Sequence, residues 1–188
     1  IVSSAISDDN PEVSEARRRG IPIEKRLSAM ADLMECKKGI GIDGTHGKST
    51  TTTMTATLLE FGGYDPTYLI GAECPRLGGN SKLGDGEHFL AEVDESDGHF
   101  INLDPELAVV TNVGEDHLDT YKDKEEILEG FRSFVGKNDN PIICTDDDES
   151  ARLIKSVDRA FTFGIEKEAD LNAVNISQKG FNTYFEVL

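Results

Sequence analysis

One segment of the chain places glycines, a lysine and hydroxyl groups in the order that a polyphosphate site requires. Residues 39–53 read GIGIDGTHGKSTTTT, so an apolar run passes through glycines to Lys48 and then into a helix-like stretch. Glycines let backbone N–H groups approach phosphate oxygens, and the N-terminus of the following helix adds a partial positive charge. Lys48 supplies a mobile cation for the terminal phosphates, and the hydroxyl of Ser49 can ligate Mg²⁺. The segment therefore predicts a nucleotide site.

This loop is shorter than the full Walker pattern. That pattern has a glycine six positions before the lysine, where this chain has Ile42, so the match is to Gly44-x-x-Gly47-Lys48-Ser49. The alternative is a glycine turn before an ordinary helix. The strand–loop–helix context favours the nucleotide site.

A cluster of carboxylates follows a second apolar run, residues 89–93. Glu92 and Asp94 lie two positions apart, so they share a face if the run is a strand, and Glu95 and Asp97 follow at its end. Clustered carboxylates repel one another and need a cation or solvent nearby. Mg²⁺ suits the cluster because it prefers oxygen ligands and binds one or two carboxylates together with phosphates. We therefore expect Glu92 to contact a metal or a substrate, with a solvated acidic turn as the alternative.

A histidine stands among acids beyond a third apolar run. His117 lies between Asp116 and Asp119, after residues 107–112. In that setting a metal ligand or a charge stabiliser is one interpretation, and a structural or exposed histidine is the other. His46, inside the glycine loop, could contact phosphate or fill the turn.

The elements that must position these groups follow from apolar periodicity and from turn residues. We expect helices over residues 11–19, 27–36, 48–61, 124–135 and 149–154. We expect strands over residues 39–43, 67–70, 89–93, 107–112, 141–145 and 159–163, and a hairpin of 173–177 with 182–187. In the third helix, Met54, Leu58 and Phe61 fall on one face.

This order of elements predicts an α/β fold, an open and mainly parallel sheet with helices on both faces. Ligands of such sheets bind at the carboxyl ends of the strands. Three predicted strand ends carry chemical groups, within residues 44–49, 92–97 and 112–119. We therefore expect these three segments to form one site.

Composition excludes some classes of function. The formal net charge is −17, from 36 acidic and 19 basic residues among 188, which argues against nucleic-acid binding. No run approaches the roughly 18 apolar residues of a membrane span, and no signal segment opens the chain. The three cysteines, Cys36, Cys74 and Cys144, have no pairing or zinc-like spacing, so reduced cytosolic thiols are expected.

Three segments in order resemble the Mur ligases: DGTHGKSTTT at 43–52, AEVDESD at 91–97 and TNVGEDHLDTY at 111–121. Residues 3–6 and 9–12 resemble the end of that family's UDP-binding N-terminal domain. The resemblance implies that residues 1–37 are the tail of that domain and that 38–188 are an incomplete P-loop-type central ATP-binding domain. The family's C-terminal domain is then absent. Because the chain also opens without an initiator methionine, we expect a fragment that catalyses little alone.

The same resemblance implies a cytoplasmic, ATP- and Mg²⁺-dependent amide-forming step of peptidoglycan synthesis. In that step ATP phosphorylates the carboxylate of UDP-N-acetylmuramate, and the amine of L-alanine attacks the acyl phosphate. By resemblance, Lys48 binds the β- and γ-phosphates, Ser49 and Glu92 ligate Mg²⁺, and His117 takes a second metal position. The residues implied to bind ATP are Gly44, Thr45, His46, Gly47, Lys48, Ser49, Thr50 and Asn112. The residues implied to line the muramoyl side are Asp94, Glu95, Ser96 and Asp97.

Three other functions remain open from the sequence. A ligase that recycles a tripeptide onto UDP-N-acetylmuramate would have similar central motifs. A P-loop hydrolase or nucleotide-gated switch would turn over ATP or GTP without a carboxylate substrate. An acidic interaction module would bind no Mg²⁺-nucleotide, and Lys48→Ala would leave such a module unchanged.

Overall fold

A mixed sheet carries the predicted site residues at the carboxyl ends of its central strands. The computed structural model describes residues 1–3, 6–95, 100–114 and 121–188. The described strands are β1 (Lys38–Asp43), β2 (Thr67–Leu69), β3 (Ser81–Lys82), β4 (His88–Glu92), β5 (Leu107–Val110), β6 (Ile142–Cys144), β7 (Phe161–Gly164), β8 (Leu171–Lys179) and β9 (Asn182–Val187). The described α-helices are α1 (Pro11–Arg18), α2 (Arg26–Glu35), α3 (Lys48–Phe61), α4 (Lys124–Val135) and α5 (Asp148–Ile154).

The described strands lie in the order β3-β2-β4-β1-β5-β6-β7-β8-β9. The pairings from β2 through β8 are parallel, and the edge pairs β2–β3 and β8–β9 are antiparallel. Strand β1 lies between β4 and β5. The loops that follow these three strands therefore leave the sheet side by side. The predicted mainly parallel sheet and its terminal hairpin are confirmed.

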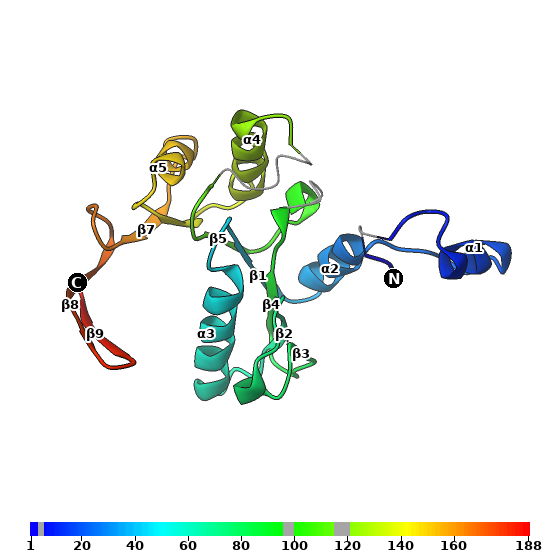
Figure 1. Cartoon of the computed structure of the whole chain (residues 1–188), viewed down its shortest axis with the longest axis horizontal. Coiled ribbons are helices and arrows are strands. Elements are labelled where there is room, and N and C mark those ends of the chain that lie inside the picture. The colour runs from blue at the N-terminus through cyan, green and yellow to red at the C-terminus, as the bar shows by residue number, and fades with distance from the viewer. Residues whose placement is uncertain (4–5, 96–99, 115–120) are drawn as a thin grey trace.

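Helices cover both faces of the sheet, as predicted (Figure 1). Buried residues of α2, α4 and α5 pack with Phe89, Ala91 and Val110 on one face. Ala56 of α3 packs with Ile42 and Leu90 on the other. Neighbouring residues of a strand point to opposite faces, so Phe89 and Leu90 enter different layers.

Helix α3 has the predicted bounds, but its apolar positions face outward. Met54, Leu58 and Phe61 share a side of the helix and are 61%, 70% and 76% exposed. The buried positions are Thr52 and Ala56. The Thr52 hydroxyl donates to Lys48 O within the helix at 2.8 Å, so its polar group is satisfied beneath the helix. Small side chains let α3 approach the sheet closely.

Helix α4 follows its predicted pattern, with Ile127, Leu128, Phe131, Phe134 and Val135 all buried. Its start is fixed by Asp123, whose side chain accepts the backbone N–H of Glu126 at 3.0 Å.

The N-terminal segment divides between two locations. Helix α1 lies well away from the sheet, at the far end of the molecule (Figure 1). Helix α2 instead buries Leu27, Met30 and Met34 in the core beneath the sheet. The domain division between residues 37 and 38 stays a prediction.

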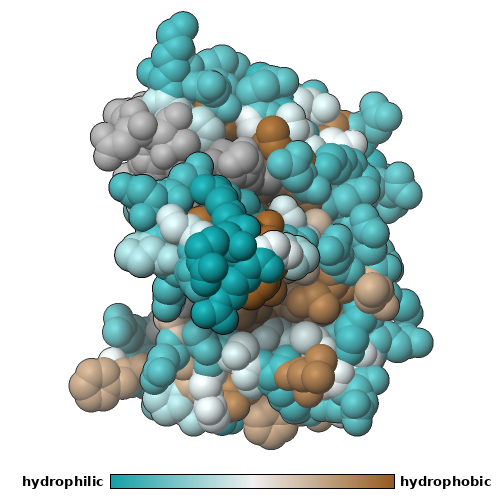
Figure 2. All heavy atoms as spheres, turned by 90° about the vertical axis from the view of Figure 1, so that its right-hand side faces the viewer, coloured by the Kyte–Doolittle hydropathy of each residue, from teal (hydrophilic) through white to brown (hydrophobic). Residues whose placement is uncertain are grey.

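The face that carries α1 is mainly hydrophilic, with scattered hydrophobic residues (Figure 2). Among the described residues, no helix is long and apolar enough to cross a membrane.

Candidate active site

The glycine loop links β1 directly to α3. Gly44 and Gly47 have φ of 133° and 83°, conformations that favour glycine. A Cβ on Gly44 would collide with the Thr111 hydroxyl and lie 2.9 Å from the Asn112 carbonyl. The loop therefore needs glycine at residue 44 both for its backbone angle and because the β5 end packs against it.

Residues after β5 hold the loop through its backbone. Asn112 Oδ1 accepts the N–H of His46 at 2.8 Å, and Asn112 Nδ2 donates to His46 O at 2.8 Å. The Thr111 hydroxyl donates to the same carbonyl at 2.7 Å. Gly114 N–H donates to the Thr45 hydroxyl at 2.6 Å. Asn112 therefore holds the backbone of the glycine loop at His46. Its predicted contact with ATP stays a prediction.

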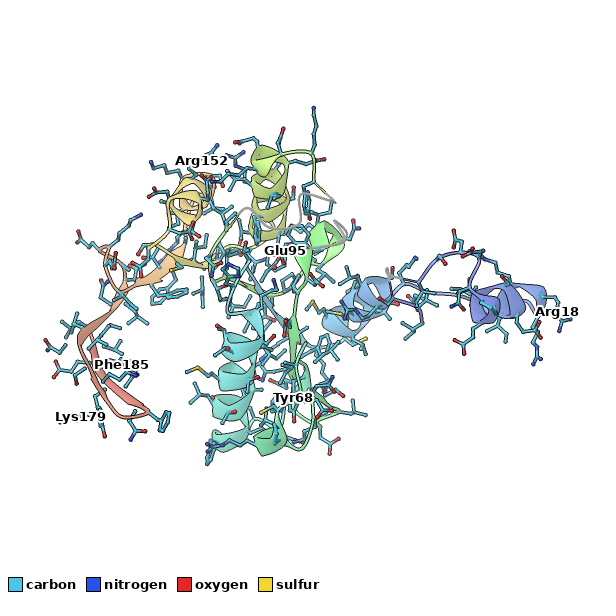
Figure 3. All side chains as sticks on the ribbon, in the orientation of Figure 1. Arg18, Tyr68, Glu95, Arg152, Lys179 and Phe185 are labelled. Carbon is cyan, nitrogen blue, oxygen red and sulfur yellow. The ribbon has the colours of Figure 1, made fainter. Side chains whose placement is uncertain are left out.

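Lys48 begins α3 and folds back over the loop. Its Nζ donates to Gly44 O at 2.6 Å and to Thr45 O at 3.3 Å. It also forms an ion pair with Glu95 Oε2 at 2.9 Å, with side chains 14% and 2% exposed. Figure 3 places Glu95 at the end of the sheet beside the start of α3.

The two predicted magnesium ligands meet in the structure. Ser49 Oγ, at the start of α3, donates to Glu92 Oε1, at the end of β4, at 2.9 Å. Glu92 Oε2 accepts the backbone N–H of Gly71 at 2.6 Å, which orients the carboxylate. A Cβ on Gly71 would lie 2.5 Å from the Glu92 carboxylate, so a larger residue here would displace the end of the Glu92 side chain.

These oxygens fit Mg²⁺, a hard cation that keeps several waters and takes few protein ligands. Within the described ranges, no group of three or more His, Cys, Asp or Glu side chains could hold a metal. The described residues that would hold the cation are therefore Ser49 and Glu92, and phosphate oxygens and water would complete the coordination. His117, predicted for a second metal position, lies outside the described residues.

A second buried carboxyl lies beneath the loop and was not singled out from the sequence. Asp43 is fully buried, and its Oδ1 accepts the N–H of Gly44 at 2.7 Å. Burial raises the pKa of Asp43 well above its ordinary value, and the negative charge of Glu95 raises this pKa further. The Gly44 N–H and the positive charge of Lys48 act in the opposite direction. The sequence signal was an acid ending a buried strand directly before the glycine loop.

The residues predicted for the muramoyl side are only partly described. Asp94 is half-buried, whereas Glu95 is buried against Lys48. Ser96 and Asp97 lie outside the described residues. His46 and Thr50 are exposed on the loop and on the first turn of α3.

The comparison with known families decides the class of protein. The Mur ligase middle domain matches residues 42–188, and a second model, the catalytic domain of the Mur ligase family, matches residues 1–38. The chain belongs to the Mur ligase family.

Curated relatives in this family are named UDP-N-acetylmuramate–L-alanine ligase. Those of Geotalea uraniireducens and Syntrophotalea carbinolica are each 47% identical, over 98% and 100% of this chain. The chain spans 41% and 42% of their lengths.

Solved Mur ligases have the same fold. The UDP-N-acetylmuramate–alanine ligase of Thermotoga maritima matches 98% of the chain and 42% of its own, with a TM-score of 0.86 and 30% identity. A tripeptide ligase from Neisseria meningitides matches 97% of the chain and 62% of its own, with a TM-score of 0.79 and 22% identity. A Thermotoga maritima Mur ligase solved in complex with ADP matches 88% of the chain and 42% of its own, with a TM-score of 0.69 and 19% identity. The last two likenesses concern the fold.

Proposed function

We propose that the whole protein is an ATP- and Mg²⁺-dependent ligase that joins L-alanine to UDP-N-acetylmuramate in cytoplasmic peptidoglycan synthesis. One observation carries the proposal: Lys48, Ser49 and Glu92 converge at the carboxyl ends of β1 and β4. They do so in a chain 47% identical to ligases of that name.

The arrangement suits phosphoryl transfer, which depends on positioning and charge neutralisation more than on covalent chemistry by the protein. Bound Mg²⁺-ATP supplies the phosphoryl group that activates the muramoyl carboxylate, and the amine of L-alanine then displaces phosphate. Backbone N–H groups of the glycine loop and the N-terminus of α3 favour the anionic phosphates. Lys48 neutralises the terminal phosphates, and Ser49 with Glu92 holds the cation. The local positive end of α3 acts against the chain's net negative charge.

Phosphate release by the full-length protein tests the proposal. The assay contains Mg²⁺-ATP and UDP-N-acetylmuramate, with L-alanine, the tripeptide L-alanyl-γ-D-glutamyl-meso-diaminopimelate, or no amine. We expect release that depends on L-alanine and is lost in Lys48→Ala. A matched control is Lys155→Ala, which alters an exposed lysine at the end of α5.

The other outcomes would assign other activities. Release that depends on the tripeptide would make the protein a recycling ligase. Equal release without amine or UDP-N-acetylmuramate would make it a hydrolase and overturn the ligase proposal. An absence of Mg²⁺-nucleotide binding would leave an interaction module.

A further inference from the structure

Lys48 has all of its hydrogen-bond donors engaged inside the protein. A lysine ammonium has three N–H donors and no acceptor. Those of Lys48 face Gly44 O at 2.6 Å, Glu95 Oε2 at 2.9 Å and Thr45 O at 3.3 Å. A phosphate oxygen can gain a hydrogen bond from Lys48 only if one of these three acceptors gives it up.

Glu95 is the acceptor that most resembles a phosphate. It is anionic, and charge-assisted hydrogen bonds are stronger than neutral ones. Its side chain is 2% exposed, so water screens the attraction weakly. The two loop carbonyls are neutral and belong to the residues that precede Lys48 in the chain.

The main chain of Glu95 is also held in place by a buried tyrosine. The Tyr121 hydroxyl donates to the Glu95 carbonyl oxygen, and Tyr121 is itself buried. Beneath the pair, the buried Asp43 carboxyl is anchored to the loop at Gly44 N–H. Burial raises the pKa of Asp43, and the Lys48 ammonium and the Glu95 carboxylate form an ion pair at 2.9 Å. Because Tyr121 holds the main chain of Glu95, the ion pair opens by movement of the Lys48 or the Glu95 side chain.

We propose that Glu95 is a positioning residue that holds Lys48 inside the nucleotide-free loop, in place of a terminal phosphate, and releases it when a nucleotide binds. This inference rests on the proposed nucleotide site. It assigns Glu95 a different role from the predicted muramoyl contact. The held form does not offer Lys48 to phosphate, so it lowers the fraction of binding-competent protein and weakens apparent nucleotide affinity.

The test is calorimetric titration of the full-length protein with AMP-PNP and with AMP, both with Mg²⁺. Glu95→Gln keeps the shape and an oxygen acceptor but removes the charge that holds the lysine. We expect AMP-PNP to bind about five- to tenfold more tightly to this variant, as the competent fraction rises. AMP affinity is expected to be unchanged, because AMP has no terminal phosphates for Lys48. Glu60→Gln is the matched control, since Glu60 pairs with Lys82 at the other end of α3.

Unchanged or weaker AMP-PNP binding in Glu95→Gln would overturn the inference. A raised KM for UDP-N-acetylmuramate with unchanged AMP-PNP binding would assign Glu95 to the substrate instead. If the wild-type protein binds no AMP-PNP, the proposed function itself fails, which is a separate result.

A measurement on the unaltered protein covers the case in which Glu95→Gln does not fold. Crystal structures of the full-length enzyme with and without Mg²⁺-AMP-PNP would give the distance from Lys48 Nζ to Glu95. We expect this distance to lengthen beyond hydrogen-bond range in the complex, with Nζ on the terminal phosphates. If Lys48 Nζ contacts phosphate and still lies within 3 Å of the Glu95 carboxylate, the proposal that Glu95 releases the lysine is refuted.

Discussion

The hydroxyl of Ser49 donates to the carboxylate of Glu92 at 2.9 Å and so joins the start of α3 to the end of β4. This bond brings a hydroxyl oxygen and a carboxylate to one point, although 43 residues separate them in the chain. Both are ligands that Mg²⁺ accepts.

Substitution of either ligand should raise the Mg²⁺ concentration that the ligase needs for activity. For Ser49→Ala and Glu92→Gln in the full-length protein we expect ligase activity to fall at least about tenfold at limiting Mg²⁺. Part of the loss should be recovered at higher Mg²⁺, which a titration of phosphate release against Mg²⁺ measures. Ser133→Ala, at an exposed serine of α4, is the control. Equal Mg²⁺ dependence in all proteins would remove these residues from the metal site.

The side chain of Asn112 should determine how firmly the glycine loop is held. Asn112→Ala removes two hydrogen bonds to His46, each contributing about 0.5–1.5 kcal/mol to stability. We expect faster hydrogen exchange at the His46 amide and a free energy of unfolding lower by about 1–3 kcal/mol. Hydrogen-exchange mass spectrometry and denaturant unfolding measure these effects. Asn140→Ala, at an exposed asparagine, is expected to change neither quantity. Unchanged hydrogen exchange at His46 in Asn112→Ala would show that Asn112 does not hold the loop.

Asp43 should make stability fall as pH rises. Its pKa is raised in the folded protein, so the folded state binds this proton more tightly than the unfolded chain does. The resulting stability is fully present below the ordinary value of 3.8 and is lost as pH rises toward the folded pKa. Asp43→Asn keeps an acceptor for Gly44 N–H and does not titrate. We expect its stability relative to wild type to rise with pH above about 4.

Urea unfolding at a series of pH values from 4 to 8 measures that difference. Asp9→Asn, an exposed aspartate, controls for the loss of one negative charge. A difference between Asp43→Asn and wild type that does not vary with pH would show that Asp43 does not titrate in this window.

Substitution on the buried side of α3 should cost more stability than substitution on its exposed side. Ala56 is 0% exposed, so Ala56→Leu overpacks the sheet and should lower the free energy of unfolding by about 1–3 kcal/mol. Leu58 is 70% exposed, and Leu58→Ala should change it by less than about 0.5 kcal/mol. Thermal and denaturant unfolding compare the two variants. A larger loss for Leu58→Ala would mean that the apolar side of α3 is covered.

Local patterns in the sequence were enough to place the main elements. Helix α3 begins at the predicted lysine, because Gly47, in the left-handed conformation, ends the loop directly before it. Helix α4 follows its apolar spacing because one layer of the core covers that whole side. The convergence of Ser49 and Glu92 was also predicted, because the ends of parallel strands meet at one edge of a sheet.

The tertiary structure decided what periodicity leaves open. An apolar stripe identifies one side of a helix but does not show whether another layer covers that side. In α3 the small residues face the sheet and Met54 faces outward. The muramoyl contact of Glu95 stays a prediction of the family resemblance, and its pairing with Lys48, 47 residues away, is visible only in the structure. Similarly, Asn112 reaches His46 across 66 residues. Which polar groups meet depends on strand order and burial, because a buried charge needs a partner that only the assembled sheet supplies.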